Sequence, residues 1–256
     1  MCSTPEPEVV LRDDRGEPYA DVVLTGEPPV LTLDDLRLRP ERDEAVALVA
    51  DGLRRLAVGA GATVLEVEVP AGDAVRAAVV DGTRLLGERM IKSLATEPRV
   101  PEGFAWRPLT EAELGPWQER SVRAYAEDGL DGFGGDLDLA LADARQDFVR
   151  LLPDGLATLD TSLVVLAADG VRVGHLWVRH HHAAGRSYVY DVEVDEQHRG
   201  RGHGRSAMLV AELLARRAGD TTLGLHVFGW NTVARTLYRS LGYDLRSSTY
   251  DLLTRG

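Results

Sequence analysis

The chain has 256 residues, of which 44% are hydrophobic and 27% charged, and its net charge is −12. This length corresponds to roughly 1.7 average domains, enough to bury a sizeable core without disulfide staples. The acidic balance argues against a general nucleic-acid binder, because phosphate contacts need clustered cationic side chains. The single cysteine, Cys2, excludes an intramolecular disulfide framework.

Features that would direct the chain to a membrane or out of the cell are missing from its pattern. No apolar run approaches the ~18 residues of a membrane span. The first ten residues lack the basic start and apolar core of a secretory signal. Because one cysteine also suits a reducing compartment, we expect a cytoplasmic protein with no membrane partner.

The first part of the chain has a predicted helix over Glu44–Leu56, and alternating apolar residues at Leu65, Val67 and Val69. Two prolines and a glycine then mark a linker near Thr96–Gly103. We therefore expect a first domain at residues 1–97, a linker at 98–103 and a second domain at 104–256.

The second part alternates strands and helices. A capping box at Thr110 and Glu113 and a hairpin turn at Asp169-Gly170 mark two of the boundaries. The expected strands are Phe104–Pro108, Ser162–Ala168, Val171–His180, Ser187–Val194, Thr222–Phe228 and Arg246–Leu252, and the expected helices are Thr110–Asp128, Asp136–Leu152, Arg201–Ala218 and Thr232–Leu241. This order predicts an α/β fold, with helices packed on a mixed sheet.

The two parts resemble each other weakly. Residues 63–83 match residues 221–241 at an offset of 158, and the preceding helix matches Arg205–Arg217 if the offset becomes 161. A true repeat, chance, and shared helix–strand patterning are all compatible with this match.

A glycine-rich segment, Arg199-Gly200-Arg201-Gly202-His203-Gly204-Arg205, joins a predicted strand to a long helix. Its glycines let the backbone approach a ligand closely, and helix N-terminal amides attract an anion. The spacing differs from a Rossmann fingerprint, and a P-loop Gly-Lys-Ser/Thr is missing. The segment favours a pyrophosphate cradle, with a flexible glycine turn as the alternative.

Two motifs connect these residues to a known family. Arg199-x-x-Gly202-x-Gly204 resembles the acetyl-CoA pyrophosphate motif of the GNAT N-acetyltransferases. The strand and helix from Leu225 to Tyr243, with Asn231, Ala234 and Tyr238, resemble that family's second motif. The resemblance covers about residues 104–256 and implies the GNAT acyl-CoA N-acyltransferase fold, in a tandem arrangement with a truncated, degenerate N-terminal lobe.

The resemblance also implies where acetyl-CoA binds. Backbone groups of Val192, Glu193 and Val194 would meet the pantetheine arm, which Asn231, Ala234 and Arg235 would flank. The pyrophosphate would be held by the loop, that is, by Arg199, Gly200, Arg201, Gly202, His203, Gly204 and Arg205. No metal is implied.

Two residues are predicted to carry the chemistry. Tyr238 would lie beside the thioester sulfur, where a hydroxyl with a pKa of about 10 suits a general acid. His226 occupies the position of a catalytic glutamate in some relatives, and its pKa near ~6.5 suits a base. A packed helix aromatic and a buried, hydrogen-bonded histidine are the structural alternatives.

The strand before the loop offers other carboxylates as bases. Strand alternation predicts that Asp191 and Glu193 share one face, while Tyr188, Tyr190 and Val192 share the other. Since relatives with bases on this strand match the tyrosine positions, the two carboxylates are the weaker candidates.

Two further features border the expected acceptor site. In His180-His181-His182, only His180 and His182 could converge by alternation, so a hairpin end is favoured over a metal site. The acidic stretch from Glu127 to Asp138 is expected to connect two helices. Its carboxylates would suit a cationic amine, or would simply be solvated.

The first domain lacks the cofactor motif. Arg39-Pro40-Glu41-Arg42-Asp43-Glu44 stands in place of the glycine loop, and Asp73, Val80 and Arg84 replace Asn231, Tyr238 and Gly242. We expect this lobe to bind no CoA, and instead to pack on the second domain, shape the acceptor cleft or support a homodimer.

The favoured function is acetyl transfer from acetyl-CoA to a primary amine, by direct attack in a ternary complex. The acceptor would be a small molecule or a peptide N-terminus. The alternative is a non-catalytic acyl-CoA-binding sensor or interaction module.

Overall fold

A computed structural model describes residues 9–39, 45–133 and 135–255. Its contacts divide the chain into two compact units: one ends at Glu88 and resumes at Leu245, and the other is Arg89–Asp244. The predicted linker, residues 98–103, contains no helix or strand, but the units divide earlier, within a strand. None of the described helices is both long and apolar enough to cross a membrane.

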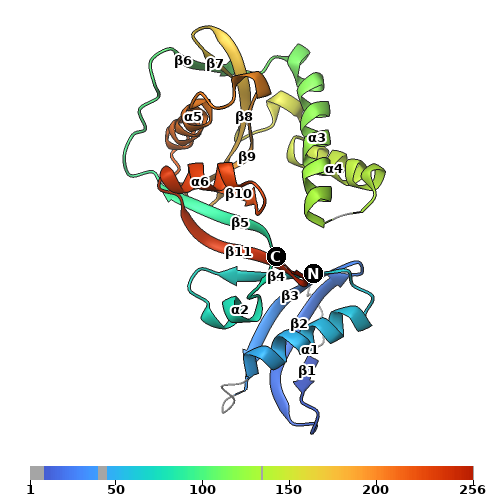
Figure 1. Ribbon diagram of the computed structural model, residues 1–256. Coiled ribbons are helices and arrows are strands. Elements are labelled where there is room, and N and C mark those ends of the chain that lie inside the picture. Colours follow the sequence, from blue (N-terminus) through green and yellow to red (C-terminus); the bar gives the residue numbers. More distant parts are fainter. Residues whose placement is uncertain (1–8, 40–44, 134, 256) are drawn as a thin grey trace. The chain divides into compact units, whose positions relative to one another are not determined.

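The first unit is a sheet with helices packed on it. Its elements are β1 (Val9–Arg12), β2 (Pro18–Glu27), β3 (Val30–Leu38), α1 (Ala45–Gly59), β4 (Val64–Pro70), α2 (Ala74–Val79), the start of β5 (Thr83–Ser93), and β11 (Asp244–Arg255). The strand order is β1-β2-β3-β4-β11-β5, with β3 and β4 parallel. Figure 1 shows α1 lying across the strands, and its apolar face, with Val49 and Leu53, forms the core with Leu65 and Val67.

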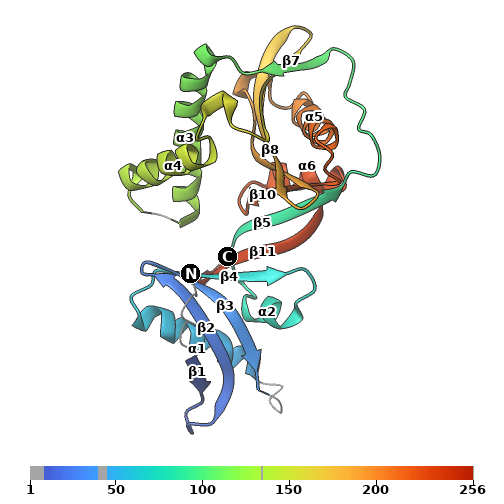
Figure 2. The ribbon, with the colours of Figure 1, turned by 180° about the vertical axis from the view of Figure 1, so that it is seen from behind.

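The second unit has helices on both faces of its sheet. It contains the end of β5, β6 (Phe104–Pro108), α3 (Glu111–Phe133), α4 (Leu137–Leu151), β7 (Thr161–Ala168), β8 (Val171–Ala183), β9 (Arg186–Val194), α5 (His203–Arg217), β10 (Thr222–Phe228) and α6 (Thr232–Ser240), with 3-10 turns at Gly155–Ala157 and Glu196–His198. Strands run in the order β5-β10-β9-β8-β7-β6. Figures 1 and 2 show α3 and α4 on one side of β8 and β9, and α5 on the other. Separate cores fill the two faces, with Met208 and Leu225 on the α5 side and Trp117 and Trp177 on the α3 side.

The predicted α/β class and the element order of the second part are confirmed. The Asp169-Gly170 turn has positive φ at both residues (49° and 80°), as a tight hairpin requires. The carboxylate of Glu113 accepts from the backbone N–H of Thr110 at 2.9 Å and also binds Arg107, which starts α3 as expected. The predicted end of α3 was wrong, since the helix continues to Phe133 instead of stopping at Asp128.

The weak repeat is a repeat of structure. Elements of the first unit recur 158 residues later in the second. Ala45, which starts α1, corresponds to His203, which starts α5, and Val64, which starts β4, corresponds to Thr222, which starts β10. The predicted change of offset to 161 at the helix was wrong. At 158, the buried residues of α1 fall on buried residues of α5: Val49, Ala50, Leu53 and Ala57 correspond to Ala207, Met208, Ala211 and Ala215. Burial, not letter identity, sets the register of the two helices.

The tandem arrangement with a shortened first lobe is therefore confirmed. In the described part of the chain, the first unit has no counterpart of β6, α3 and α4. Its sheet includes β11 from the far end of the chain, paired with β4 from Ser247 opposite Pro70 to Asp251 opposite Glu66.

Gly174 fixes the approach of β8 to β9. A Cβ at this position would overlap the carbonyl oxygen of Glu193, and backbone cannot move aside as a flexible side chain can. We expect Gly174→Ala to lower the free energy of unfolding by about 1–3 kcal/mol in urea denaturation. The control is Gly129→Ala within α3, where a Cβ meets nothing within 4 Å and a gain of about 0.5–1 kcal/mol is expected. Equal stability changes in the two variants would contradict this close approach.

Candidate functional site

The site begins where two parallel strands stop pairing. β9 and β10 pair only from Arg186 opposite Thr222 to Val189 opposite Leu225. On its other edge, β9 carries a bulge, because Val189 opposes Val178 and Asp191 opposes Trp177. Tyr190 is therefore an extra residue, and such a bulge bends its strand and disrupts the ladder. The bend accompanies the separation of β9 from β10.

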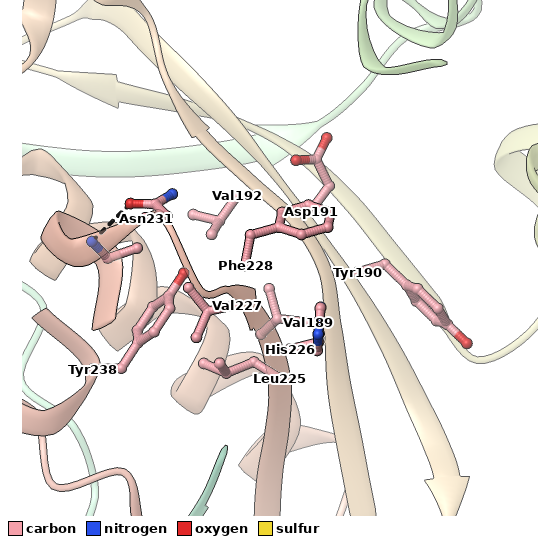
Figure 3. Close-up of a pocket in the computed structure, with 11 residues that line it drawn as sticks. Val189, Tyr190, Asp191, Val192, Leu225, His226, Val227, Phe228, Asn231 and Tyr238 are labelled. Carbon is pink, nitrogen blue, oxygen red and sulfur yellow. Dashed lines mark hydrogen bonds between the residues drawn. The ribbon is translucent and has the colours of Figure 1, made fainter. Parts of the chain in front are cut away.

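The separated strands enclose a pocket of about 140 Å³. Its lining comes from β9, β10 and α6: Val189, Tyr190, Asp191, Val192, Leu225, His226, Val227, Phe228, Asn231, Ala234 and Tyr238. Figure 3 shows Tyr238 and Asn231 on one side of the strands and Tyr190 on the other. The pocket is thus lined by side chains from both faces of the sheet.

The bulge corrects part of the predicted alternation on β9: Asp191 and Glu193 share a face as expected, but Tyr190 lies on that face instead of with Val192. Tyr190 contacts Trp177 at a ring distance of 5.0 Å, and Asp191 opposes that same residue. The two neighbours therefore both lie on the α3 side of the sheet, while Val189 and Val192 pack in the α5 core. Simple alternation failed because it counts every residue as paired.

Tyr238, the predicted general acid, lies on α6 and is 7% exposed. Burial, with a smaller contribution from the charge of Asp191, raises its pKa to about 12. Its ring packs against Tyr243. The hydroxyl keeps its proton across the neutral range, which is the state a general acid requires.

His226, the predicted base, is an accessible residue of the pocket. Its neighbours Leu225 and Val227 are buried in the α5 core, so its imidazole faces the α3 side. The surrounding protein, aided by the positive charge of Arg89, lowers the pKa of His226. The ring is therefore neutral at pH 7, with solvent reaching part of it.

Asp191 anchors a hydrogen-bonded cluster that the sequence did not reveal. Its Oδ2 accepts from Nε2 of His175 at 2.7 Å and from Oγ of Ser121 at 3.1 Å. His175 is 1% exposed, and its Nδ1 lies 3.6 Å from Oε2 of Glu193. Only the β8–β9 register, with its bulge, identifies His175 as the partner of these carboxylates.

The glycine loop leaves the start of α5 open. Gly200 and Gly202 have φ of 75° and 84°, and a Cβ on either would meet nothing within 4 Å. Gly202 occupies the N-cap position of α5 without any side-chain cap, so no side chain satisfies the amides that a helix start leaves without an intrahelical partner. This geometry suits an anion at the helix N-terminus.

Other loop residues make contacts within the protein. Nε of Arg199 donates to the carbonyl of Val194 at 3.1 Å, and Arg205 donates to Oγ of Ser240 at 2.6 Å. Each guanidinium retains further N–H donors. Gly204 lies close to α6, since a Cβ there would be 3.3 Å from the side chain of Leu237.

The second-motif residues divide into two groups. Asn231 and Ala234 line the pocket, and the Asn231 side-chain oxygen caps α6 by accepting from the Ala234 N–H at 3.0 Å. This capping leaves the amide nitrogen of Asn231 available to a ligand. Arg235 instead donates to the carbonyl of Gly229 at 2.9 Å. In the glycine loop, His203 stacks on Phe104.

The three consecutive histidines have different partners. His180 is buried between Ser162 and Ser187, and His181 binds Asp220. The three histidines lie near the end of the β8–β9 hairpin, as the pattern favoured, and the rings of His180 and His182 do not converge. An irregularity in β8, with φ of 50° at His181, separates the two rings, and that of His182 packs on Tyr188. The residues described in this structure include no cluster of three or more potential metal ligands.

Two other expectations concern segments outside the pocket. Most of the acidic stretch, up to Phe133, belongs to α3 and does not form a connection. The first-unit counterpart of the glycine loop, residues 40–44, lies outside the described residues. Of the replaced positions, Asp73 caps α2 through the N–H of Arg76, and Val80 is buried in the first core.

Comparison with known proteins assigns the chain to a family. The protein-family model described as "Acetyltransferase (GNAT) family" matches residues 135–243 of the chain. The uncharacterized N-acetyltransferase YycN of Bacillus subtilis is 30% identical over 140 residues, which make up 54% of this chain and 90% of that protein. The chain belongs to the GNAT acetyltransferase family. It is therefore an acyltransferase of a family that generally uses acetyl-CoA.

Further GNAT relatives cover other shares of the chain. A mycothiol acetyltransferase of Clavibacter sepedonicus is 31% identical over 173 residues, 66% of this chain and 49% of that protein. The crystal structure of YycN has a TM-score of 0.52 and 29% identity, covering 55% of this chain and 92% of its own. A GCN5-related N-acetyltransferase from Sphaerobacter thermophilus shares the fold over 97% of this chain and 81% of its own, with a TM-score of 0.58 and 17% identity.

The open space before α5 provides a test of whether the glycine loop binds acetyl-CoA. A Trp side chain at position 202 would fill this space, so we expect Gly202→Trp to weaken acetyl-CoA binding by at least about tenfold in calorimetry. The matched control is Gly219→Trp, since Gly219 follows the other end of α5, also has positive φ (89°) and also faces open space. Equal affinities in the two variants would exclude the loop as the cofactor site.

Proposed function

We propose that this GNAT protein transfers an acetyl group from acetyl-CoA to a primary amine, by direct attack within a ternary complex. The observation that carries the proposal is the opening between β9 and β10. It begins after Val189 and Leu225, and α6, which lines it, contacts the first turn of α5 through Arg205 and Ser240. A donor entering from the α5 side and an acceptor entering from the α3 side would meet in one pocket.

The donor is held by this chain's own groups in the proposal. The first-turn amides of α5 and the nearby arginines bind the pyrophosphate, and the amide nitrogen of Asn231 binds along the pantetheine arm. Since β10 no longer pairs with β9 beyond Val189, backbone N–H groups on that edge can bind the thioester oxygen. The thioester supplies the acetyl group.

The acceptor has to lose a proton before its nitrogen can attack. Asp191 and Glu193 present negative charge on the α3 side, which attracts an ammonium group, and His226 is the neutral base beside them. Tyr238 gives its proton to the departing thiolate on the opposite side of the strands. Base and acid thus come from different faces of the sheet.

Removal of the Tyr238 hydroxyl tests the general acid. We expect Tyr238→Phe to lower kcat about 100-fold, with little change in KM, because only departure of the thiolate needs the donor. The pKa of about 12 puts the loss of this proton beyond the usual assay range, so the rate itself is the measurement. Tyr243→Phe, on the ring packed against Tyr238, should leave kcat unchanged. An unchanged kcat in Tyr238→Phe would exclude the role.

The pH dependence of kcat/KM tests the base. The pKa of His226 is lowered by desolvation and by Arg89, so the neutral form dominates down to a pH below 6.5. The rate should fall only when the pH drops through this lowered value and the ring becomes charged. We expect His226→Gln to lose this limb and to lower the plateau about 100-fold. We expect Asp191→Asn to raise KM and retain the limb, whereas loss of the limb in Asp191→Asn alone would assign the base to Asp191.

A further inference from the structure

A second cavity lies on the α3 side of the sheet, in the same unit. Its volume is about 470 Å³, and its walls come from α4, the segment after it and the β8–β9 hairpin. Tyr190 lines both this cavity and the pocket between β9 and β10. The bulged tyrosine therefore connects the place of reaction to a larger space on the acceptor face.

Two arginines line this second cavity. Nη1 of Arg179 donates to the carbonyl of Leu159 at 2.7 Å and to Oγ1 of Thr161 at 3.2 Å, which fixes the guanidinium in place. Its remaining N–H groups keep their capacity to donate. Arg150 lies across the cavity on α4, with Asp147 at 2.9 Å. Asp154 is the one carboxylate among the lining residues that the structure describes.

The positive charge of the arginines affects the pKa values of two neighbouring side chains. Desolvation lowers the pKa of His182, and the charges of Arg186 and Arg179 lower it further. For Tyr190, burial raises the pKa, and Arg179 and Arg150 act against that rise. A site with this potential favours a ligand that carries negative charge.

We propose that this second cavity is the acceptor subsite and that it binds the anionic group, carboxylate or phosphate, of the amine substrate. The inference rests on the proposed amine acetylation and specifies its substrate class. The amine would lie toward His226 and Asp191, past Tyr190, and the anionic group would bind Arg179 and Arg150. Arginine suits this role because its planar guanidinium pairs with carboxylate or phosphate through two hydrogen bonds.

This inference differs from what the acidic stretch suggested. Those carboxylates were expected either to border the acceptor site and suit a cationic amine or to be simply solvated. Glu127 and Asp128 instead lie within α3, and neither lines the second cavity.

Matched pairs of amines test the subsite. The pairs are L-serine against L-serinamide, and glucosamine 6-phosphate against glucosamine, so that one arm reports on carboxylate and the other on phosphate. Binding is measured by calorimetry without acetyl-CoA, and turnover by release of free CoA. In at least one pair we expect the anionic member to bind about tenfold more tightly, as expected for one charge-assisted contact.

Three variants locate the effect. We expect Arg179→Gln and Arg150→Gln each to reduce the preference for the anionic member several-fold. Arg145→Gln, on the exposed face of α4 and outside the cavity, should retain it. Because Arg179 also holds Leu159, the more exposed Arg150 keeps the test valid if Arg179→Gln fails to fold.

The outcomes separate this inference from the proposed function. Equal or tighter binding of the neutral members in both pairs would overturn the subsite, as would a preference that survives Arg150→Gln. Anion-selective binding without CoA release from any amine would support the subsite and contradict the acetylation of these amines. CoA release with no preference for the anionic members would support the acetylation of these amines and contradict the subsite.

Discussion

The end of the hydrogen bonding between β9 and β10 is the constraint on which the site depends. Parallel strands normally stay paired along their length, but here the pairing stops at Val189 and Leu225. The extra residue Tyr190 bends β9, and the ladder to β8 continues beyond it. The opposite edge of β9 is thereby freed without loss of the strand. Backbone groups that would satisfy a neighbouring strand remain available to a ligand.

The same bulge decides which side chains meet. It brings Asp191 to the α3 side, where His175 and Ser121 hold one of its oxygens. It also leaves Tyr190 in the lining of both the pocket between β9 and β10 and the second cavity, which Arg179 also lines. One backbone irregularity therefore accompanies the opening between β9 and β10, positions a carboxylate on the α3 side and brings Tyr190 to both cavities.

The two lobes share one architecture but differ in the side chains at equivalent positions. Asp73 and Asn231 cap equivalent helices in the same way, each accepting an N–H three residues on. The capping interaction is retained because an uncapped helix costs about 1 kcal/mol. At the position of the buried phenol of Tyr238, the first lobe has buried Val80. Packing is thus conserved between the lobes where the polar group is not.

The sequence alone was enough to predict the class of fold, the order of elements after residue 104 and the family, because periodicity, caps and glycine spacing are local properties. It also identified Asn231, Ala234, His226 and Tyr238, which the structure brings to one pocket. The faces of β9, the partner of Asp191 and the charges around the second cavity depend on the tertiary structure. Each of these follows from the register between strands distant in sequence, and a single bulged residue shifts that register without leaving a local signal.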